Sequence, residues 1–305
     1  MKFFLQALGY GALALGLLVM FSLGNSAYIA TSGEKSDVLQ NVEYIDVNGE
    51  KIAYREAGNG NSDVLVLIHG FLGSSYDYSS IIPSLEDHYH IIAPDLIGFG
   101  FSTKNESFNY SKESLSDFVY LTLKELGIKE FNLLGHSMGG EVALNLVLNH
   151  PESVNKLILV DSGGYIQNER SIPSNEFIGS LYLRVAFQNY FLQRNVFKLA
   201  FYDQKAVDIS DFKPTYSLVY NIPSKTLYKF SKDDDGGSIA EKIKIVKTPT
   251  LIIWGDKDEL IDVEYAKRFN KELVNSQLII VKDTGHIPYI EKQEVFLEAL
   301  FEFIN

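Results

Sequence analysis

The segment Gly135-His136-Ser137-Met138-Gly139-Gly140 lies directly after the apolar run Phe131–Leu134 and opens a helical pattern over Met138–Asn149. A serine between glycines at a strand-to-helix junction is typical of a nucleophile elbow, in which a tight turn holds the hydroxyl out above the start of the helix. The glycines keep Cβ atoms away from the neighbouring strand and helix. An ordinary turn with a capping serine is the alternative. We predict that Ser137 is a catalytic nucleophile.

Apolar runs and helical patterns alternate on both sides of this segment. Asn48-Gly49 between two short alternating runs indicates a β-hairpin. Later runs are apolar on both faces, as strands of a parallel sheet covered by helices are. This order predicts an α/β fold. The expected strands are Val42–Val47, Lys51–Glu56, Val64–Ile68, Ile91–Pro94, Phe131–Leu134, Leu157–Val160, Leu251–Trp254 and Leu278–Val281, and the expected helices are Ser74–Glu86, Lys112–Leu126, Met138–Asn149, Glu264–Leu273 and Glu291–Phe303.

One long segment, residues 163–246, interrupts the alternation. It contains 84 residues and 14 of the 39 aromatic residues of the chain. A structureless loop of this length is rare in a compact domain. We therefore predict a mostly helical cap over residues 163–246, above the strand ends, and a core formed by residues 41–162 and 247–305. Most of the cap aromatics should pack among themselves, and some should face the cleft beneath.

A serine nucleophile requires a general base, and a base requires an acid that orients it. His286 follows the last predicted strand, so it should lie at the same sheet edge as Ser137. Asp258, in Gly255-Asp256-Lys257-Asp258, follows the preceding strand and is the predicted acid. Asp161, one strand earlier, is the alternative acid, whereas Asp256 should brace its loop.

Ester chemistry also requires donors for a tetrahedral oxyanion. The backbone N–H of Phe71, in His69-Gly70-Phe71-Leu72-Gly73, is one candidate, and that of Met138, at the start of a helix, is the other. The Asp95–Ser102 loop should be structural. No phosphate-loop or zinc-helix motif is present, so we predict no metal and no cofactor. The run Asp233–Gly237 lacks the ligand spacing of an EF-hand and should be a solvated acidic turn.

Composition excludes several classes of protein. The chain of 305 residues contains no cysteine, which rules out disulfides, thiolate metal sites and a cysteine nucleophile. Its net charge of −12 argues against a nucleic-acid partner, because such binding requires Lys and Arg to neutralise phosphates. The same charge is a poor match for electrostatic binding to anionic lipid.

The N-terminus contains a strongly apolar stretch. Phe3–Leu23 is a run of 21 residues without charge, long enough to cross a bilayer as a helix. Lys2 favours a cytoplasmic N-terminus, which would leave the catalytic domain outside the cytoplasm. We predict a membrane anchor over residues 1–24 and a linker over residues 25–40. The alternative is a signal peptide cleaved near Ala27, which would give a secreted or periplasmic protein.

Residues 41–305 resemble the α/β-hydrolase superfamily in five motifs: the His-Gly loop, the segment Asp95–Ser102, the serine elbow, the Gly-Asp-Lys-Asp loop and Gly-His-Ile-Pro. The sequence looks most like capped serine esterases and lipases, including bacterial lipases with an export segment and membrane-anchored monoacylglycerol lipases. The resemblance implies a mostly parallel eight-stranded sheet flanked by helices, with a helical cap. It also implies a catalytic triad with Ser137, Asp258 and His286, and oxyanion donors at Phe71 and Met138.

The resemblance further implies hydrolysis of a small-molecule carboxylic ester, a lipid or acylglycerol, through an acyl-enzyme on Ser137. Epoxide hydrolases and haloalkane dehalogenases of the superfamily carry Asp at this position, which argues against both. Serine-dependent hydrolases of C–C bonds in ring-cleavage products retain the serine and are an alternative. A non-enzymatic membrane protein with this fold is another.

Overall fold

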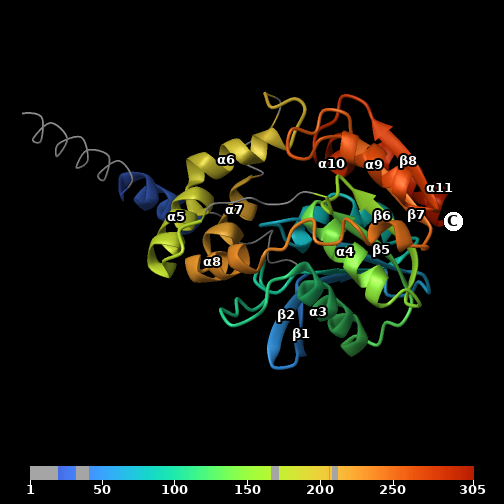
Figure 1. The fold of residues 1–305 in the computed structure, drawn as a ribbon, viewed down its shortest axis with the longest axis horizontal. Helices are drawn as coiled ribbons and strands as arrows, with labels where there is room; N and C mark the ends of the chain where they lie inside the picture. Colours follow the sequence, from blue (N-terminus) through green and yellow to red (C-terminus); the bar gives the residue numbers. More distant parts are fainter. Residues whose placement is uncertain (1–19, 32–40, 166–171, 206, 208–211) are drawn as a thin grey trace, which may run out of the picture.

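The computed structural model describes residues 20–31, 41–165, 172–205, 207 and 212–305. Its centre is an eight-stranded sheet in the order β1-β2-β4-β3-β5-β6-β7-β8 (Figure 1). β1 pairs antiparallel with β2, and β2 with β4, whereas all other neighbours are parallel. The strands are β1 Glu43–Val47, β2 Glu50–Ala57, β3 Val64–Ile68, β4 His90–Pro94, β5 Phe131–His136, β6 Val154–Val160, β7 Thr250–Gly255 and β8 Ser276–Val281.

The predicted α/β-hydrolase fold with a mostly parallel sheet is confirmed. The hairpin between β1 and β2 turns at Asn48 and Gly49, which have φ values of 54° and 83°. A two-residue type I′ turn requires positive φ at both central positions, which explains the Asn-Gly pair. The central parallel strands β3, β5 and β7 are buried along nearly their whole length, which explains their continuous apolar runs.

Helices cover both faces of the sheet. α3 (Lys112–Glu125), α4 (Met138–Asn149) and α9 (Glu264–Glu272) bury apolar side chains on one face. α2 (Ile82–Leu85), α10 (Pro288–Glu291) and α11 (Gln293–Ile304) cover the other face.

The single helix expected over Ser74–Glu86 is divided into a 3₁₀ turn, Ser75–Tyr78, and α2. Pro83 lies in the first turn of α2, where its missing N–H costs no hydrogen bond. Proline therefore starts a second short helix here and does not continue the first.

Between β6 and β7, the described residues form four helices, which we call the cap, followed by a short 3₁₀ turn at Ile243–Ile245. The helices are α5 (Glu176–Gln188), α6 (Tyr190–Leu199), α7 (Phe212–Tyr220) and α8 (Ser224–Asp233). Figure 1 shows these helices gathered at one end of the core, away from the C-terminus. Tyr190, Phe212 and Tyr216 form a small aromatic core within the cap, separate from the two cores of the sheet.

Residues 20–31 are helical and lie against the cap (Figure 1). The side-chain amide of Asn189 donates to Ser22 Oγ at 2.6 Å, and the Tyr190 N–H donates to Ser26 Oγ at 3.0 Å. Ala30 is buried in the aromatic core of the cap. The first part of the expected linker is therefore a docked helix.

Residues 1–19 and 32–40 lie outside the described residues, and with them most of the predicted membrane segment and the rest of the linker. Within the described ranges, no helix combines the length and the apolar character needed to span a bilayer.

Candidate active site

Ser137 occupies a strained turn between β5 and α4. Its backbone has φ 56° and ψ −125°, a region that residues other than glycine adopt only where the surroundings enforce it. The Ser137 N–H donates to the carbonyl of Val160 (3.0 Å), and its own carbonyl accepts from Gly140 (3.0 Å) and Gly163 (2.8 Å). A Cβ at Gly139 would lie 2.3 Å from the Ile68 carbonyl oxygen, so the turn requires glycine there. The strain and the close contacts are those of a nucleophile elbow.

His286 and Asp258 are joined by a short hydrogen bond, Nδ1 to Oδ2 at 2.7 Å. Their side chains are 7% and 0% exposed. The loops that carry them touch closely, because a Cβ at Gly255 would lie 1.9 Å from the carbonyl oxygen of Gly285. Glycine at position 255 therefore allows the loops of the acid and the base to approach each other.

Asp258 is held as a carboxylate. Burial alone would raise the pKa of Asp258, but the hydrogen bond and positive charge of His286 and two backbone donors outweigh it and keep this pKa below its usual value. The two donors are the N–H groups of Leu260 (2.8 Å) and Ile261 (3.0 Å), both to Oδ1. Asp258 thus has the partners that the acid of a serine triad requires.

Asp161, the alternative acid, lies behind this pair. Polar atoms of Asp161, Asp258 and His286 all lie within 4.8 Å of one another. Asp161 is fully buried, and its Oδ1 accepts the Gly255 N–H at 3.0 Å. Burial, followed by the charge of Asp258, raises the pKa of Asp161 well above its usual value. Two adjacent buried carboxyl groups do not both ionise, so Asp161 keeps its proton while Asp258 carries the charge.

The spacing of these three groups also bears on metal binding. Two ligands about 2.0–2.1 Å from a tetrahedral metal lie about 3.3 Å apart. The 2.7 Å contact between His286 and Asp258 is shorter and matches a charge-assisted hydrogen bond. The arrangement therefore fits a proton between the two side chains better than a shared metal ion.

Two further histidines have structural contacts. His136 Nε2 donates to the carbonyl of His286 at 2.9 Å, which ties the residue before the nucleophile to the loop of the predicted base. Burial, with the charge of His286, lowers the pKa of His136 to about 3, so this ring is neutral. His69 Nε2 accepts the Leu96 N–H at 2.9 Å, and its Nδ1 donates to the carbonyl of Gly70 at 2.8 Å. Both rings brace loops of the site.

Phe71 and Met138 line the same cavity as Ser137, which has a volume of about 210 Å³. Leu72, the residue after Phe71, has φ 61°, so this loop is also strained. No hydrogen bond joins the Ser137 hydroxyl to His286 within the described part of the chain. In enzymes without substrate, such catalytic contacts are often long and tighten on binding. Ser137, Phe71 and Met138 therefore share one cavity, and the pair of His286 and Asp258 is tied to His136, the residue before Ser137.

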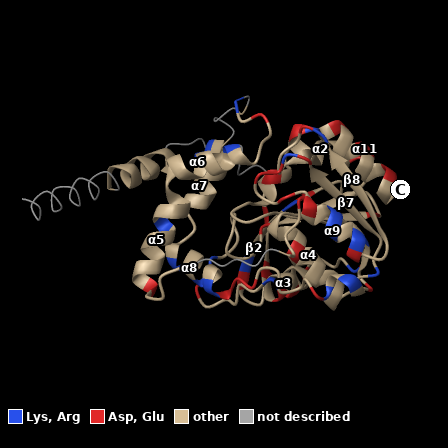
Figure 2. Ribbon diagram, turned by 45° about the horizontal axis from the view of Figure 1, so that its top comes forward, with Lys and Arg blue, Asp and Glu red and all other residues tan. Residues whose placement is uncertain are grey.

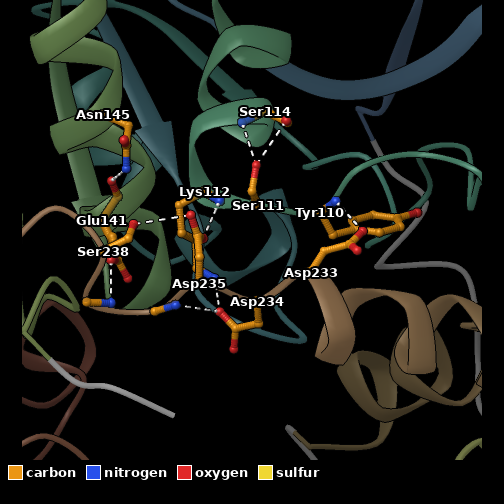
Figure 3. A network of polar contacts seen from close by, with 12 residues as sticks. Tyr110, Ser111, Lys112, Ser114, Glu141, Asn145, Asp233, Asp234, Asp235 and Ser238 are labelled. Carbon is orange, nitrogen blue, oxygen red and sulfur yellow. Dashed lines mark hydrogen bonds and ion pairs between the residues drawn. The ribbon is translucent and has the colours of Figure 1, made fainter. Parts of the chain in front are cut away.

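Residues 233–237 do not form the solvated turn that the sequence suggested. Asp233 accepts the N–H of Tyr110 (3.0 Å) and Asp235 accepts the N–H of Lys112 (3.0 Å), while Asp234 pairs with the Lys112 ammonium. Figure 3 shows this network between the end of α8 and the start of α3. The expectation was wrong because the unpaired N–H groups at a helix start attract carboxylates, and here they come from a distant segment.

Lys112, Glu141 and Asp234 also line the Ser137 cavity. Asp234 belongs to the acidic run Asp233–Gly237, whereas Lys112 and Glu141 belong to no motif. Glu141 alone had a sequence signal, since it follows Ser137 by four residues and thus lies near the nucleophile on the same helix.

Comparisons with known proteins give the same family. A model of the alpha/beta hydrolase fold matches residues 63–221 and 184–293. An uncharacterised hydrolase of Bacillus subtilis is 32% identical over 266 residues, covering 85% of this chain and 96% of the relative. Lipase 1 of Psychrobacter immobilis is 31% identical over 262 residues, covering 80% and 77%. A meta-cleavage product hydrolase from Pseudomonas fluorescens has a similar structure, with 25% identity and a TM-score of 0.71, covering 86% and 97%.

The chain belongs to the α/β-hydrolase family, and the Ser137 turn lies at the position where its sequence resembles the serine elbow of that family. Its relatives include a protein named as a lipase, and its structural neighbours include a meta-cleavage product hydrolase.

Proposed function

We propose that the protein is a serine hydrolase that cleaves carboxylic esters, with Ser137 as nucleophile, His286 as base and Asp258 as acid. The observation that carries this proposal is the strained Ser137 turn at a cavity beside the hydrogen-bonded pair of His286 and Asp258. The relative named as a lipase supports an ester over other substrates.

In the proposed reaction, His286 Nε2 takes the Ser137 proton as Oγ attacks the ester carbonyl carbon. The backbone N–H groups of Phe71 and Met138 stabilise the oxyanion. His286 then protonates the leaving alcohol, and an acyl group remains on Ser137. Water, activated by His286, attacks this acyl-enzyme and releases the carboxylic acid. Asp258 stabilises the positive charge that His286 carries between these steps.

A lipid ester, such as a monoacylglycerol, is the substrate class that we propose. A series of p-nitrophenyl esters of rising acyl length, measured beside a monoacylglycerol, tests it. We expect a burst of p-nitrophenol equal to the enzyme concentration wherever deacylation is slow. Absence of hydrolysis for every ester, together with absence of fluorophosphonate labelling at Ser137, would remove this function.

Cleavage of C–C bonds is the second candidate, because a meta-cleavage product hydrolase shares the fold at 25% identity. It predicts turnover of a dienoic ring-cleavage product with little hydrolysis of simple esters. A non-enzymatic role predicts neither reaction and no labelling of Ser137. The same panel of substrates therefore separates the three functions.

We also propose that the N-terminal segment attaches the protein to a membrane, with the catalytic domain outside the cytoplasm. Apart from the uncharged run itself, exposed apolar side chains on the cap support this attachment. Figure 2 shows α5, α6 and α7 as mostly tan ribbons, with few charged residues. The exposed apolar side chains of helices α5 and α6 and of residues 20–31 include Met20, Phe21, Phe177, Ile178, Leu181, Tyr182, Phe191, Leu192 and Val196.

The charge of the protein is also unevenly distributed. Residues 163–246 contain 11 Lys and Arg and 9 Asp and Glu, a net charge of +2, although the whole chain carries −12. The cap therefore lacks the negative charge that would repel an anionic bilayer. The overall charge alone suggested the opposite.

Membrane fractionation tests the attachment. The full chain should remain with membranes through high-salt and carbonate washes, because a hydrophobic attachment does not depend on charge. A chain lacking Met1–Gly24 should be released in active form, since Ser26 and Ala30 still hold the helix on the cap. A mature N-terminus near Ala27 would instead show that a signal peptide is cleaved and the protein is secreted or periplasmic.

A further inference from the structure

The cavity beside Ser137 has charged as well as apolar side chains in its wall. Three charged side chains lie in this wall: Lys112 from the start of α3, Glu141 from the first turn of α4, and Asp234 from the segment after α8 (Figure 3). Phe71 and Phe230 line the same space. The cavity therefore offers both apolar and hydrogen-bonding surfaces within reach of the nucleophile.

Lys112 retains hydrogen-bonding capacity toward this cavity. Its side chain is 3% exposed, and its ammonium pairs with Asp234 and lies 5.0 Å from the ring of Phe230. An ammonium has three N–H donors. Among the hydrogen bonds of the described residues, Asp234 accounts for one of them, which leaves two for a ligand.

Glu141 likewise has one carboxyl oxygen available for a ligand. Its Oε1 accepts the Gly237 N–H at 2.7 Å, while Oε2 has no hydrogen bond within the described ranges. Burial raises the pKa of Glu141 to about 7, against the opposing charge of Lys112. Near neutral pH this carboxyl group exists in both forms, so it accepts a hydrogen bond when ionised and donates one when protonated.

A purely structural role does not account for these two groups. The segment after α8 is already fastened by the backbone N–H groups of Tyr110 and Lys112, which donate to Asp233 and Asp235. A buried ion pair is a costly way to add further stability, since desolvation offsets most of its attraction. The Lys112 ammonium and the Glu141 Oε2 atom are not needed for that fastening.

We propose that Lys112 and Glu141 form a polar subsite that binds the hydroxyl groups of a neutral polyol ester, such as the glycerol part of an acylglycerol. This inference rests on the ester hydrolase function proposed above. It adds that the alcohol side of the substrate is recognised by hydrogen bonds, next to the carbonyl that Ser137 attacks.

Hydroxyl groups fit this wall better than the other ligand chemistries. An anionic group would meet Asp234 and Glu141, and a cationic group would meet Lys112. A hydrocarbon would leave the ammonium and the carboxyl group buried without partners, which is unfavourable. Hydroxyls accept from Lys112 and exchange either kind of hydrogen bond with Glu141, so a neutral polyol satisfies both side chains.

The test compares esters that share one acyl chain. The kcat/KM values of the full-length protein in detergent are measured for 1-monooctanoylglycerol, 1-octanoyl-lysophosphatidylcholine and ethyl octanoate. The wild-type protein should prefer 1-monooctanoylglycerol to the ethyl ester by about 10- to 100-fold, the range expected for hydrogen bonds to a charged group. A higher kcat/KM for the charged lysophospholipid than for 1-monooctanoylglycerol would overturn a subsite that selects neutral hydroxyl groups.

Lys112→Met and Glu141→Leu should remove most of this preference while lowering kcat/KM for ethyl octanoate much less. Glu141→Gln keeps a donor and an acceptor and should retain the preference. Lys225→Met is the matched control, because Lys225 is 59% exposed and pairs with Glu176 on the cap. The rate of fluorophosphonate labelling at Ser137 reports whether each variant is folded and reactive.

Equal losses for all three esters would show a structural role and overturn the subsite. Equal kcat/KM values of the wild-type protein for glyceryl and ethyl esters would overturn it as well. Both results leave the ester hydrolase standing. If no ester is hydrolysed and Ser137 is not labelled, the proposed function fails, and the subsite fails with it.

Discussion

The sheet edge that carries Ser137 and the helical cap above it are held in different ways. At the sheet edge, backbone contacts dominate: the Ser137 carbonyl accepts two N–H groups, and Gly255 touches the Gly285 carbonyl. In the cap, side chains dominate, through the aromatic cluster of Tyr190, Phe212 and Tyr216. Backbone contacts demand glycine at particular positions, whereas aromatic contacts tolerate exchange of one large side chain for another.

The two regions meet directly above the site. The His286 N–H donates to the carbonyl of Ala200 at 2.7 Å, and the ring of Phe187 contacts that of Phe71 with centroids 5.4 Å apart. Figure 1 shows the helices of the cap beside the core at this junction. If the sheet edge carries the chemistry and the cap determines selectivity, variants at the sheet edge should lower kcat. Variants in the cap should instead change the relative kcat/KM values of different substrates.

The largest effect should come from Ser137→Ala. Loss of a triad nucleophile lowers kcat by about 10⁶ in subtilisin-type enzymes. Ester hydrolysis and fluorophosphonate labelling should both vanish, while circular dichroism remains that of the wild-type protein. Undiminished labelling would place the nucleophile on another residue.

Asp258→Asn should lower kcat by about 10⁴, because the amide presents the wrong hydrogen-bond partner to His286. Asp161→Asn should change kcat far less, since an amide replaces a carboxyl group that already keeps its proton. Comparison of kcat for the two variants on one ester checks this prediction. A more severe loss in Asp161→Asn would move the catalytic acid to the end of β6.

Glu141→Gln should change how stability depends on pH. The pKa of Glu141 rises from 4.5 to about 7 on folding. As pH rises through this interval, the unfolded chain releases the proton first, so the free energy of unfolding falls by up to about 3 kcal/mol. The variant cannot ionise and should gain stability relative to the wild-type protein between pH 5 and pH 8.

Urea denaturation at the two pH values measures this gain. Asp77, whose pKa burial also raises to about 7, is present in both proteins and cancels in the comparison. If the difference in free energy of unfolding between variant and wild type is the same at pH 5 and pH 8, Glu141 is ionised in the folded protein throughout this interval.

The smallest effect should be a change of selectivity in Phe230→Ala. Phe230 is a buried cap residue in the cavity wall, 5.0 Å from Phe71 between ring centroids. Each CH₂ group that loses its apolar contact costs about 0.8 kcal/mol, so kcat/KM should fall more steeply for long acyl chains than for short ones. Phe177→Ala, at a side chain 78% exposed, is the matched control and should keep the wild-type profile. If kcat/KM of Phe230→Ala depends on acyl length as it does in the wild-type protein, the acyl chain binds in the core domain.

Much of the sheet edge could be predicted from the sequence. The Asn-Gly hairpin, the buried strands and the serine elbow all depend on local backbone geometry, which Gly and apolar runs report. The roles of Ser137, Asp258, His286, Phe71 and Met138 remain predictions, although the structure brings Ser137, Phe71 and Met138 to one cavity and joins His286 to Asp258. Ser137, Asp258 and His286 each follow the end of a predicted parallel strand, which was sufficient to suggest that they lie at the same sheet edge.

Three features were decided only by the tertiary structure. Residues 25–31, expected in a linker, form part of a docked helix, because Ser26 and Ala30 match a site on the cap. Asp161 differs from Asp258 in protonation only because the folded chain buries them together. Lys112 and Asp234 pair across 122 positions of sequence. Hydrophobic periodicity and turn-forming residues act over a few neighbouring positions, so the fold could be predicted from the sequence. Desolvation and charge pairing depend on residues that only folding brings into contact, so these features required the tertiary structure.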